Sequence, residues 1–185
     1  MKTALICIDF INEIVGSNGK LAAKGYRAFC ETHGTLANLA RRQASIRRDG
    51  GRVIHVHLGF ADDYADHPST SKLLGGAKAA GILRQGTAST TIPVQVKPEP
   101  GDIVIVKKRI SAFCGTDLEL VLRSLAVERV ILTGVATDLA VESAARDAHD
   151  RDFVVEVAAD ACAAASDDDH NQALKTMGKF ATILA

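Results

Sequence analysis

The sequence has no excess charge, no long apolar run and no secretion signal. Its 22 Lys and Arg residues balance 22 Asp and Glu residues, and the pI is near 7.0. This balance gives no electrostatic reason to expect nucleic acid or an anionic membrane as a partner. No apolar run approaches the length of a membrane span. Because Asp9 interrupts the first apolar run, no signal peptide is predicted and we expect a cytoplasmic protein.

Cysteine is also sparse, and without a secretion signal no disulfide framework is expected. The four residues are Cys7, Cys30, Cys114 and Cys162, and no pair has a CxxC spacing. Cys7 and Cys162 lie in or beside apolar segments, where cysteine behaves as a small buried hydrophobe. Cys114 is the one thiol to test for reactivity, although the inert interpretation is favoured there too.

Strand and helix patterns alternate along the 185 residues, which we expect to form one domain, residues 1–185. Short segments rich in Val and Ile predict strands at Thr3–Asp9, Arg52–Leu58, Asp102–Lys107, Arg129–Gly134, Phe153–Ala158 and Phe180–Leu184. Helices are expected near Glu31–Arg48, Asp117–Leu125, Asp138–Asp150 and Asp168–Met177. The alternation predicts an α/β fold, a parallel six-stranded sheet covered by helices on both faces.

Two charged residues stand at the predicted carboxyl ends of strands, where open α/β sheets place their active sites. Asp9 ends the first predicted strand and Lys107 ends the third. A turn-capping aspartate and a solvated lysine would explain them; acid–base chemistry is the alternative. Burial would raise the pKa of Asp9, and a nearby lysine would lower it. Side chains alternate along a strand, so Lys107 and Lys108 should point to opposite sides.

A glycine turn, Gly134-Val135-Ala136-Thr137, connects an apolar strand to a helix. Thr137 or Asp138 is a suitable N-cap, so an ordinary helix start is one explanation. The other explanation is a turn with a functional role at the edge of the sheet, and the two explanations are compatible.

Four segments together resemble the isochorismatase-like hydrolases, also called the cysteine hydrolase superfamily. Ala4–Phe10 is similar to the family's first strand, Val106–Leu118 to its lysine motif, Leu132–Ser143 to its nucleophile turn and Asp160–Cys162 to a late strand-end motif. They span nearly the whole chain in the expected order. In the lysine motif the lysine stands six residues before a phenylalanine, which selects Lys107 over Lys108.

The resemblance implies a three-layer α/β/α sandwich and assigns roles to several residues. Asp9 would be the acid or base, and Lys107 would pair with it. The Val135–Ala136 bond would be cis, and the N–H groups of Ala136 and Ala140 would face a substrate oxygen. The resemblance also implies a homo-oligomer, a dimer or tetramer.

The nucleophile of the family is missing. In most members a catalytic cysteine occupies the position of Ala140, and an alanine side chain cannot attack a carbonyl. Three interpretations stay open. The first is a hydrolase in which Asp9 protonates a vinyl ether and water captures the cation, as the resemblance to isochorismatases proper implies. The second is an amidohydrolase of small amides whose cysteine is replaced by Ala140, naturally or by engineering. The third is a pseudoenzyme that binds a small molecule without turnover.

Several further residues are candidates for contacts with a small-molecule substrate. Thr137 lies in the turn, and His57 is nearer the carboxyl end of its strand than His55. Phe60 and Phe113 would supply apolar walls, and Arg109 would bind a carboxylate. The long irregular segment Ala61–Pro100 would help to wall the pocket, as its counterpart does in the family. The Asp62, Asp63, Asp66 and His67 cluster does not match the metal pattern of the nicotinamidases, so no metal or other cofactor is expected.

Overall fold

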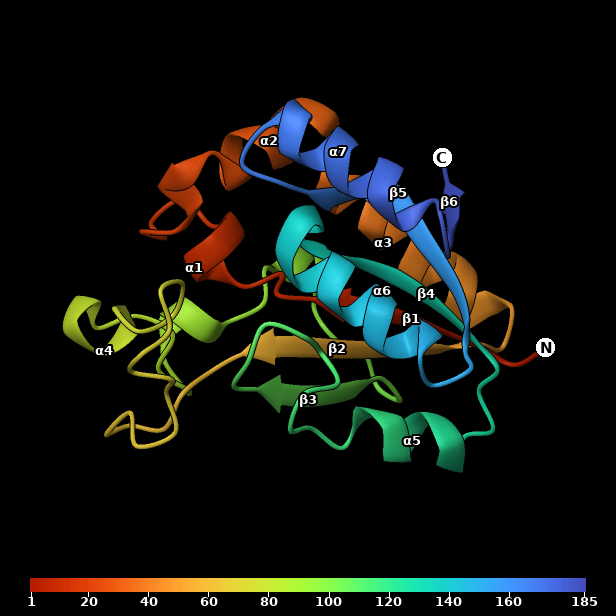
Figure 1. The fold of residues 1–185 in the computed structure, drawn as a ribbon, viewed down its shortest axis with the longest axis horizontal. Helices are drawn as coiled ribbons and strands as arrows, with labels where there is room; N and C mark the ends of the chain where they lie inside the picture. Colours follow the sequence, from red (N-terminus) through yellow and green to blue (C-terminus); the bar gives the residue numbers. More distant parts are fainter.

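A parallel six-stranded sheet forms the centre of the protein in a computed structural model that describes residues 1–185 (Figure 1). The strands are β1 (Thr3–Ile8), β2 (Arg52–Leu58), β3 (Ile103–Lys107), β4 (Arg129–Val135), β5 (Val154–Ala163) and β6 (Thr182–Leu184). Their order is β3-β2-β1-β4-β5-β6, and every neighbouring pair is parallel. The predicted fold class is therefore confirmed.

Helices cover both faces of the sheet and complete the three layers. The helices α5 (Leu118–Ser124), α6 (Glu142–His149) and α7 (Asp167–Met177) pack on one face. The helices α1 (Asn12–Val15), α2 (Tyr26–His33) and α3 (Thr35–Arg48) pack on the other. Alternate residues of β1 serve the two cores: Ile6 joins the first and Leu5 the second. A strand buried on both faces is apolar throughout, which is why the sequence pattern located β1 well.

The remaining elements are short. Helix α4 (Ala77–Ala80) lies in the long segment before β3, and 3-10 turns occur at Ala22–Lys24, Ala88–Thr90 and Val94–Val96. No helix is both long enough and apolar enough to cross a membrane.

The structure corrects two sequence expectations about helices. The single helix expected at Glu31–Arg48 is two helices, α2 and α3, separated by Gly34 with a φ of 64°. Glycine adopts this left-handed conformation without steric cost, so the chain can turn there. The helix expected from Asp138 begins as a π-helical turn, Thr137–Val141, and its N-cap is Ala136 with no side-chain cap bond. Neither Thr137 nor Asp138 caps it.

A buried histidine on β2 makes the fold sensitive to acid. His55 is 1% exposed, and its Nε2 has no hydrogen-bond partner. The nearest acid, Asp102, has its Oδ2 3.7 Å from this nitrogen but is bound to Arg47 at 2.5 Å. Burial lowers the pKa of His55 to about 4, because the charged imidazole would lose its hydration. The folded protein therefore keeps His55 neutral.

We predict that His55 lowers the free energy of unfolding as the pH falls from about 6.5 toward 4. In that window the unfolded chain binds a proton at His55 and the folded protein does not, so the free energy of unfolding decreases. Between pH 7.5 and pH 5, the wild type should lose about 2 kcal/mol more than His55→Gln. Urea unfolding at both pH values measures this, with His57→Gln as the control. Equal losses in the wild type and His55→Gln would contradict the prediction.

Candidate active site

A buried ion pair lies at the carboxyl edge of the sheet. Lys107 Nζ is 2.7 Å from Asp9 Oδ2, and the two side chains are 0% and 2% exposed. Asp9 follows β1 and Lys107 ends β3, with β2 between them in the sheet. The N–H of Leu58, at the end of β2, donates to Asp9 Oδ1 at 2.7 Å. Three adjacent strand ends thus hold one carboxyl group.

The backbone of Asp9 fixes the direction of its side chain. Its φ is 59°, a left-handed conformation that aspartate tolerates better than most residues. The Asp9 N–H donates to Val56 O at 3.0 Å, and its carbonyl accepts from Ile11 N–H at 2.8 Å. Such strained positions cluster at functional sites.

Lys107 has no donor left for a ligand. Besides Asp9, its ammonium donates to Arg109 O at 3.2 Å and to Ile110 O at 2.6 Å. An ammonium has three N–H donors, and these three acceptors use them all. Lys108 points elsewhere, as the strand alternation predicts: it pairs with Asp66 at 3.0 Å and donates to Gly59 O.

The surroundings of Asp9 favour its protonated form more than water favours that of an exposed carboxyl group. Burial raises the pKa of Asp9, and the charge of Lys107 and the hydrogen bonds from Lys107 and Leu58 oppose the rise. A buried carboxyl whose pKa is raised, beside a fixed cation, is suited to acid–base chemistry.

The turn after β4 brings backbone groups to the same place. The Val135–Ala136 peptide bond is cis. The Ala136 carbonyl accepts from Leu139 N–H at 3.2 Å and from Val141 N–H at 3.1 Å. The Ala136 N–H has no acceptor among the protein's hydrogen bonds. Ala140 is 4% exposed, and its methyl group stands where the resemblance expects a thiol.

These groups share one small cavity of about 80 Å³ with mainly apolar walls. It is lined by Asp9, Ile14, Leu21, Lys24, Tyr26, Leu58, Leu73, Leu74, Lys107, Ile110, Val135, Ala136, Leu139 and Ala140. Leu73 and Leu74 come from the long segment before β3, as the resemblance implied. A larger cavity of about 700 Å³ lies at the opposite edge, where Thr3, Arg52 and Arg129 begin their strands. It holds no comparable buried ion pair, so we place the site at the smaller cavity.

Glu13 connects the two segments of the chain that contribute walls to this cavity. Its Oε1 accepts from the N–H groups of Lys20 and Leu21, at 2.8 Å and 3.1 Å. Its Oε2 accepts from Ser89 Oγ at 3.0 Å, and that hydroxyl accepts from Leu83 N–H at 2.9 Å. One buried carboxylate therefore joins the loop after α1 to the long segment before β3.

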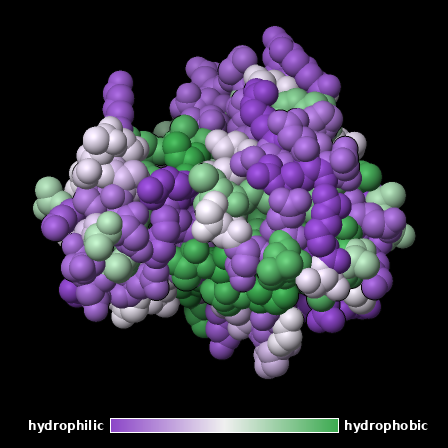
Figure 2. All heavy atoms as spheres, turned by 60° about the horizontal axis from the view of Figure 1, so that its bottom comes forward, coloured by the Kyte–Doolittle hydropathy of each residue, from purple (hydrophilic) through white to green (hydrophobic).

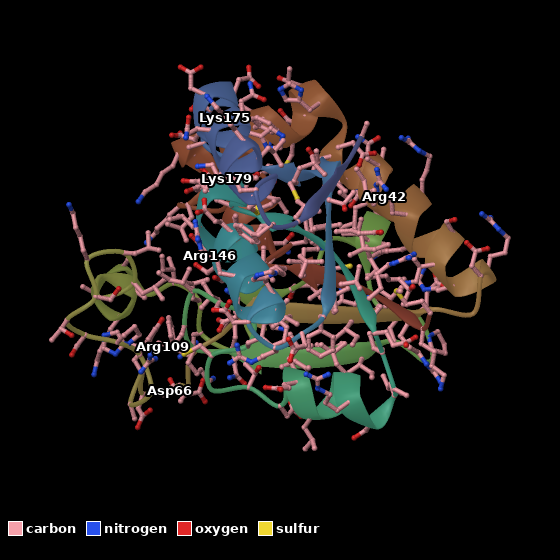
Figure 3. The ribbon with its side chains drawn as sticks, turned by 45° about the vertical axis from the view of Figure 1, so that its right-hand side comes forward. Arg42, Asp66, Arg109, Arg146, Lys175 and Lys179 are labelled. Atoms are coloured by element: carbon pink, nitrogen blue, oxygen red, sulfur yellow. The ribbon has the colours of Figure 1, made fainter.

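Five of the expected substrate contacts lie outside the cavity. Phe60 and Phe113 belong to the two hydrophobic cores, and His57 Nδ1 is 3.2 Å from Leu58 O. Thr137 is fully buried, with its hydroxyl 2.8 Å from His170 Nδ1. Arg109 is exposed beside Asp66, whose carbonyl accepts from its guanidinium at 3.2 Å (Figure 3). The two aromatic rings are buried in the hydrophobic cores. Water and backbone carbonyls solvate the charged side chain of Arg109.

Sequence reasoning missed the wall formed by Leu21, Lys24 and Tyr26. These residues lie in and just after the loop that follows α1, which carries no catalytic motif. One signal was available: loops at the carboxyl ends of parallel strands border the ligand crevice in open α/β folds.

None of the four cysteines lines the cavity. Cys7, Cys30 and Cys162 are buried, and burial raises the pKa of the Cys7 and Cys162 thiols to about 12. Cys114 is exposed. No thiol is therefore present at the ion pair.

The chain is similar to several known proteins in sequence and in fold. The isochorismatase domain model matches residues 3–185. The uncharacterized isochorismatase family protein YecD of Escherichia coli O157:H7 is 32% identical over 185 residues, covering 93% of this chain and 85% of that protein. The ureidoacrylate amidohydrolase RutB of Methylorubrum extorquens is 32% identical over 171 residues, which cover 86% of this chain and 68% of that protein. The crystal structure of an isochorismatase family protein from Desulfovibrio vulgaris superposes with a TM-score of 0.88 at 27% identity, covering 98% and 93%.

The geometry predicts that removing one partner of the ion pair costs more than removing both. Lys107→Met leaves a buried carboxyl without its cation and should lower the free energy of unfolding by about 3 to 5 kcal/mol. The double variant with Asp9→Asn should have a free energy of unfolding at least about 1 kcal/mol higher than that of Lys107→Met alone, since no buried charge then remains. Urea unfolding of both single variants and the double variant measures the coupling.

The control for this cycle is Lys108→Met, on the same strand end. Lys108 is partly exposed and paired with Asp66, so its loss should cost below about 1 kcal/mol. Strictly additive effects of Asp9→Asn and Lys107→Met would show that the pair is not coupled.

Proposed function

The chain belongs to the isochorismatase family, whose members include hydrolases, and we propose that it hydrolyses a small organic molecule without a cysteine nucleophile. The observation that supports this most is the composition of the cavity. The buried Asp9–Lys107 pair lines it together with Ala140, and no thiol does. Chemistry at this site would therefore depend on a proton and a water molecule and would form no acyl-enzyme at Ala140.

The favoured reaction is cleavage of a vinyl ether with Asp9 as the proton donor. The Asp9 carboxyl would give its proton to the terminal carbon of the C=C bond, leaving a cation stabilised by the ether oxygen. Water would add to that cation and return a proton to Asp9. The resulting hemiketal would release an alcohol and leave a carbonyl. The raised pKa of Asp9 supports the first step, and Lys107 would stabilise the carboxylate that remains.

Hydrolysis of an amide is the second candidate, because a relative is named as an amidohydrolase. Asp9 would then take a proton from an attacking water molecule, and the free Ala136 N–H would donate to the developing oxyanion. Ala140 would occupy the position of the usual cysteine, naturally or by engineering. Ammonia or amine release identifies this reaction, and release of an alcohol from a vinyl ether identifies the first. Binding without release of either product would identify a pseudoenzyme.

The homo-oligomer, a dimer or tetramer, and the cytoplasmic location both stay predictions. One feature supports association: apolar atoms gather on the face turned forward in Figure 2, which is the lower side of Figure 1, where β3 and α5 lie. Val104 on the edge strand β3 is 48% exposed, and Leu120 on α5 is 69% exposed. Exposed apolar groups beside an open sheet edge favour contact with another chain.

If Asp9 is the acid or base, Asp9→Asn should lower kcat/KM by about a hundredfold to ten-thousandfold. The amide oxygen can still accept the Leu58 N–H, but the buried Lys107 ammonium loses its anion, so activity is measured at a temperature at which the variant is folded. The measurement is product release from a panel of vinyl ethers and small amides, with circular dichroism to verify the fold. Asp62→Asn, at a side chain that is 87% exposed, is the control and should keep full activity. Activity of Asp9→Asn within about threefold of wild type would exclude the role.

Ala140→Cys should create a thiol whose pKa is below the ordinary value of about 8.5. The new side chain would lie in the first helical turn after β4 and share its cavity with Lys107, and both features favour a thiolate. The rise in ultraviolet absorbance of the thiolate with pH, measured as variant minus wild type, reports this pKa. Ala145→Cys, at a buried position on α6, is the control and should titrate high. A pKa of the introduced thiol at or above about 8.5 would contradict the inferred electrostatics.

A further inference from the structure

The cavity contains one positive charge that no other group in the protein neutralises. Its charged lining residues are Asp9, Lys107 and Lys24. Asp9 and Lys107 pair with each other, and Lys107 has no N–H left for a ligand. Lys24 is exposed and makes no ion pair or side-chain hydrogen bond. The lining therefore carries a net charge of +1, located at Lys24.

We propose that the substrate is a small carboxylate whose anionic group pairs with Lys24. This rests on the proposed function and names the substrate class for the same site. The reacting end would lie at Asp9 and Ala136, and the carboxylate would lie at the wall made by Lys24. Arg109, which the sequence suggested for this role, lies outside the cavity.

The turn that carries Lys24 is fixed at both ends. Lys24 ends the 3-10 turn Ala22–Lys24, and its N–H donates to Leu21 O at 2.9 Å. The Leu21 N–H is held in turn by Glu13. Gly25 follows with a φ of 108°, and a Cβ there would lie 2.3 Å from Ala165 O. Only glycine fits this approach to the segment between β5 and α7, so the Lys24 backbone has a set position.

Tyr26 supplies a second polar group at the same wall. It lines the cavity, and its hydroxyl makes no hydrogen bond within the protein. Burial raises the pKa of Tyr26, with Asp138 and Asp169 adding to the rise, so the phenol stays protonated. A carboxylate at this wall can accept from the Lys24 ammonium and the Tyr26 O–H together.

The other walls limit the rest of the molecule. They are built mainly from leucine, isoleucine and valine side chains, and the volume is about 80 Å³. This space suits a short apolar or unsaturated carbon skeleton. A neutral molecule of the same shape would gain no charge interaction with Lys24, and a cation would be repelled by it.

Binding of two isosteric probes tests the proposal without any turnover. Isobutyrate and 3-methyl-2-butanone have the same branched skeleton, and only the first is charged. Saturation-transfer NMR titrations at low ionic strength would give Kd for each probe. Isobutyrate should bind the wild type more tightly than the ketone does. Lys24→Gln should weaken isobutyrate binding about fivefold and leave ketone binding unchanged. Lys24→Arg should restore isobutyrate binding.

Lys97→Gln is the matched control, since it removes one exposed positive charge that does not line the cavity. It should leave the Kd of isobutyrate unchanged. The proposal is overturned if isobutyrate does not bind the wild type or if Lys24→Gln weakens the binding of both probes equally. It is also overturned if Lys97→Gln raises the Kd of isobutyrate as much as Lys24→Gln does. Because the readout is binding, it does not depend on Asp9. A substrate turned over at an undiminished rate by Asp9→Asn would refute the proposed function alone.

Discussion

The ion pair between Asp9 and Lys107 is the constraint on which the rest of the site depends. Both side chains are almost completely removed from water, and a buried charge is tolerated only when it is paired and hydrogen-bonded. The pairing requires the ends of β1 and β3 to face each other across β2, and Leu58 of β2 completes the arrangement. The parallel sheet supplies this register, and the covering loops exclude the water that would otherwise solvate the two charges.

The same constraint decides what the cavity can recognise. Because Lys107 uses its three N–H groups inside the protein, it supports Asp9 and does not bind substrate. The side chains of the cavity walls therefore recognise the substrate, and these walls come from loops after α1 and before β3. The site thus separates two tasks: strand ends hold the reacting groups, and loops select the molecule. Such a division is common in α/β proteins, where a rigid sheet supports variable loops.

The sequence predicted the part of the molecule that depends on local pattern. The Val- and Ile-rich segments located the sheet, and the motif residues Asp9, Lys107 and Ala140 meet at one cavity. The missed features depend on contacts between distant segments. Phe60 and Phe113 were expected at the walls, but a sequence does not tell whether an aromatic ring points into a core or a pocket. Lys24 has no motif around it and lines the site only because Glu13 and Ala165 position its turn.

The way Glu13 joins two wall loops has a consequence for how this protein can diversify. On the first loop its carboxylate binds the backbone N–H groups of Lys20 and Leu21, and backbone amides are present whatever side chains those positions carry. The walls can therefore exchange residues such as Leu21 or Leu73 while the anchor persists. A redesign of substrate range would keep Glu13 and Ser89 as the fixed contact between the two loops and vary the leucines around them.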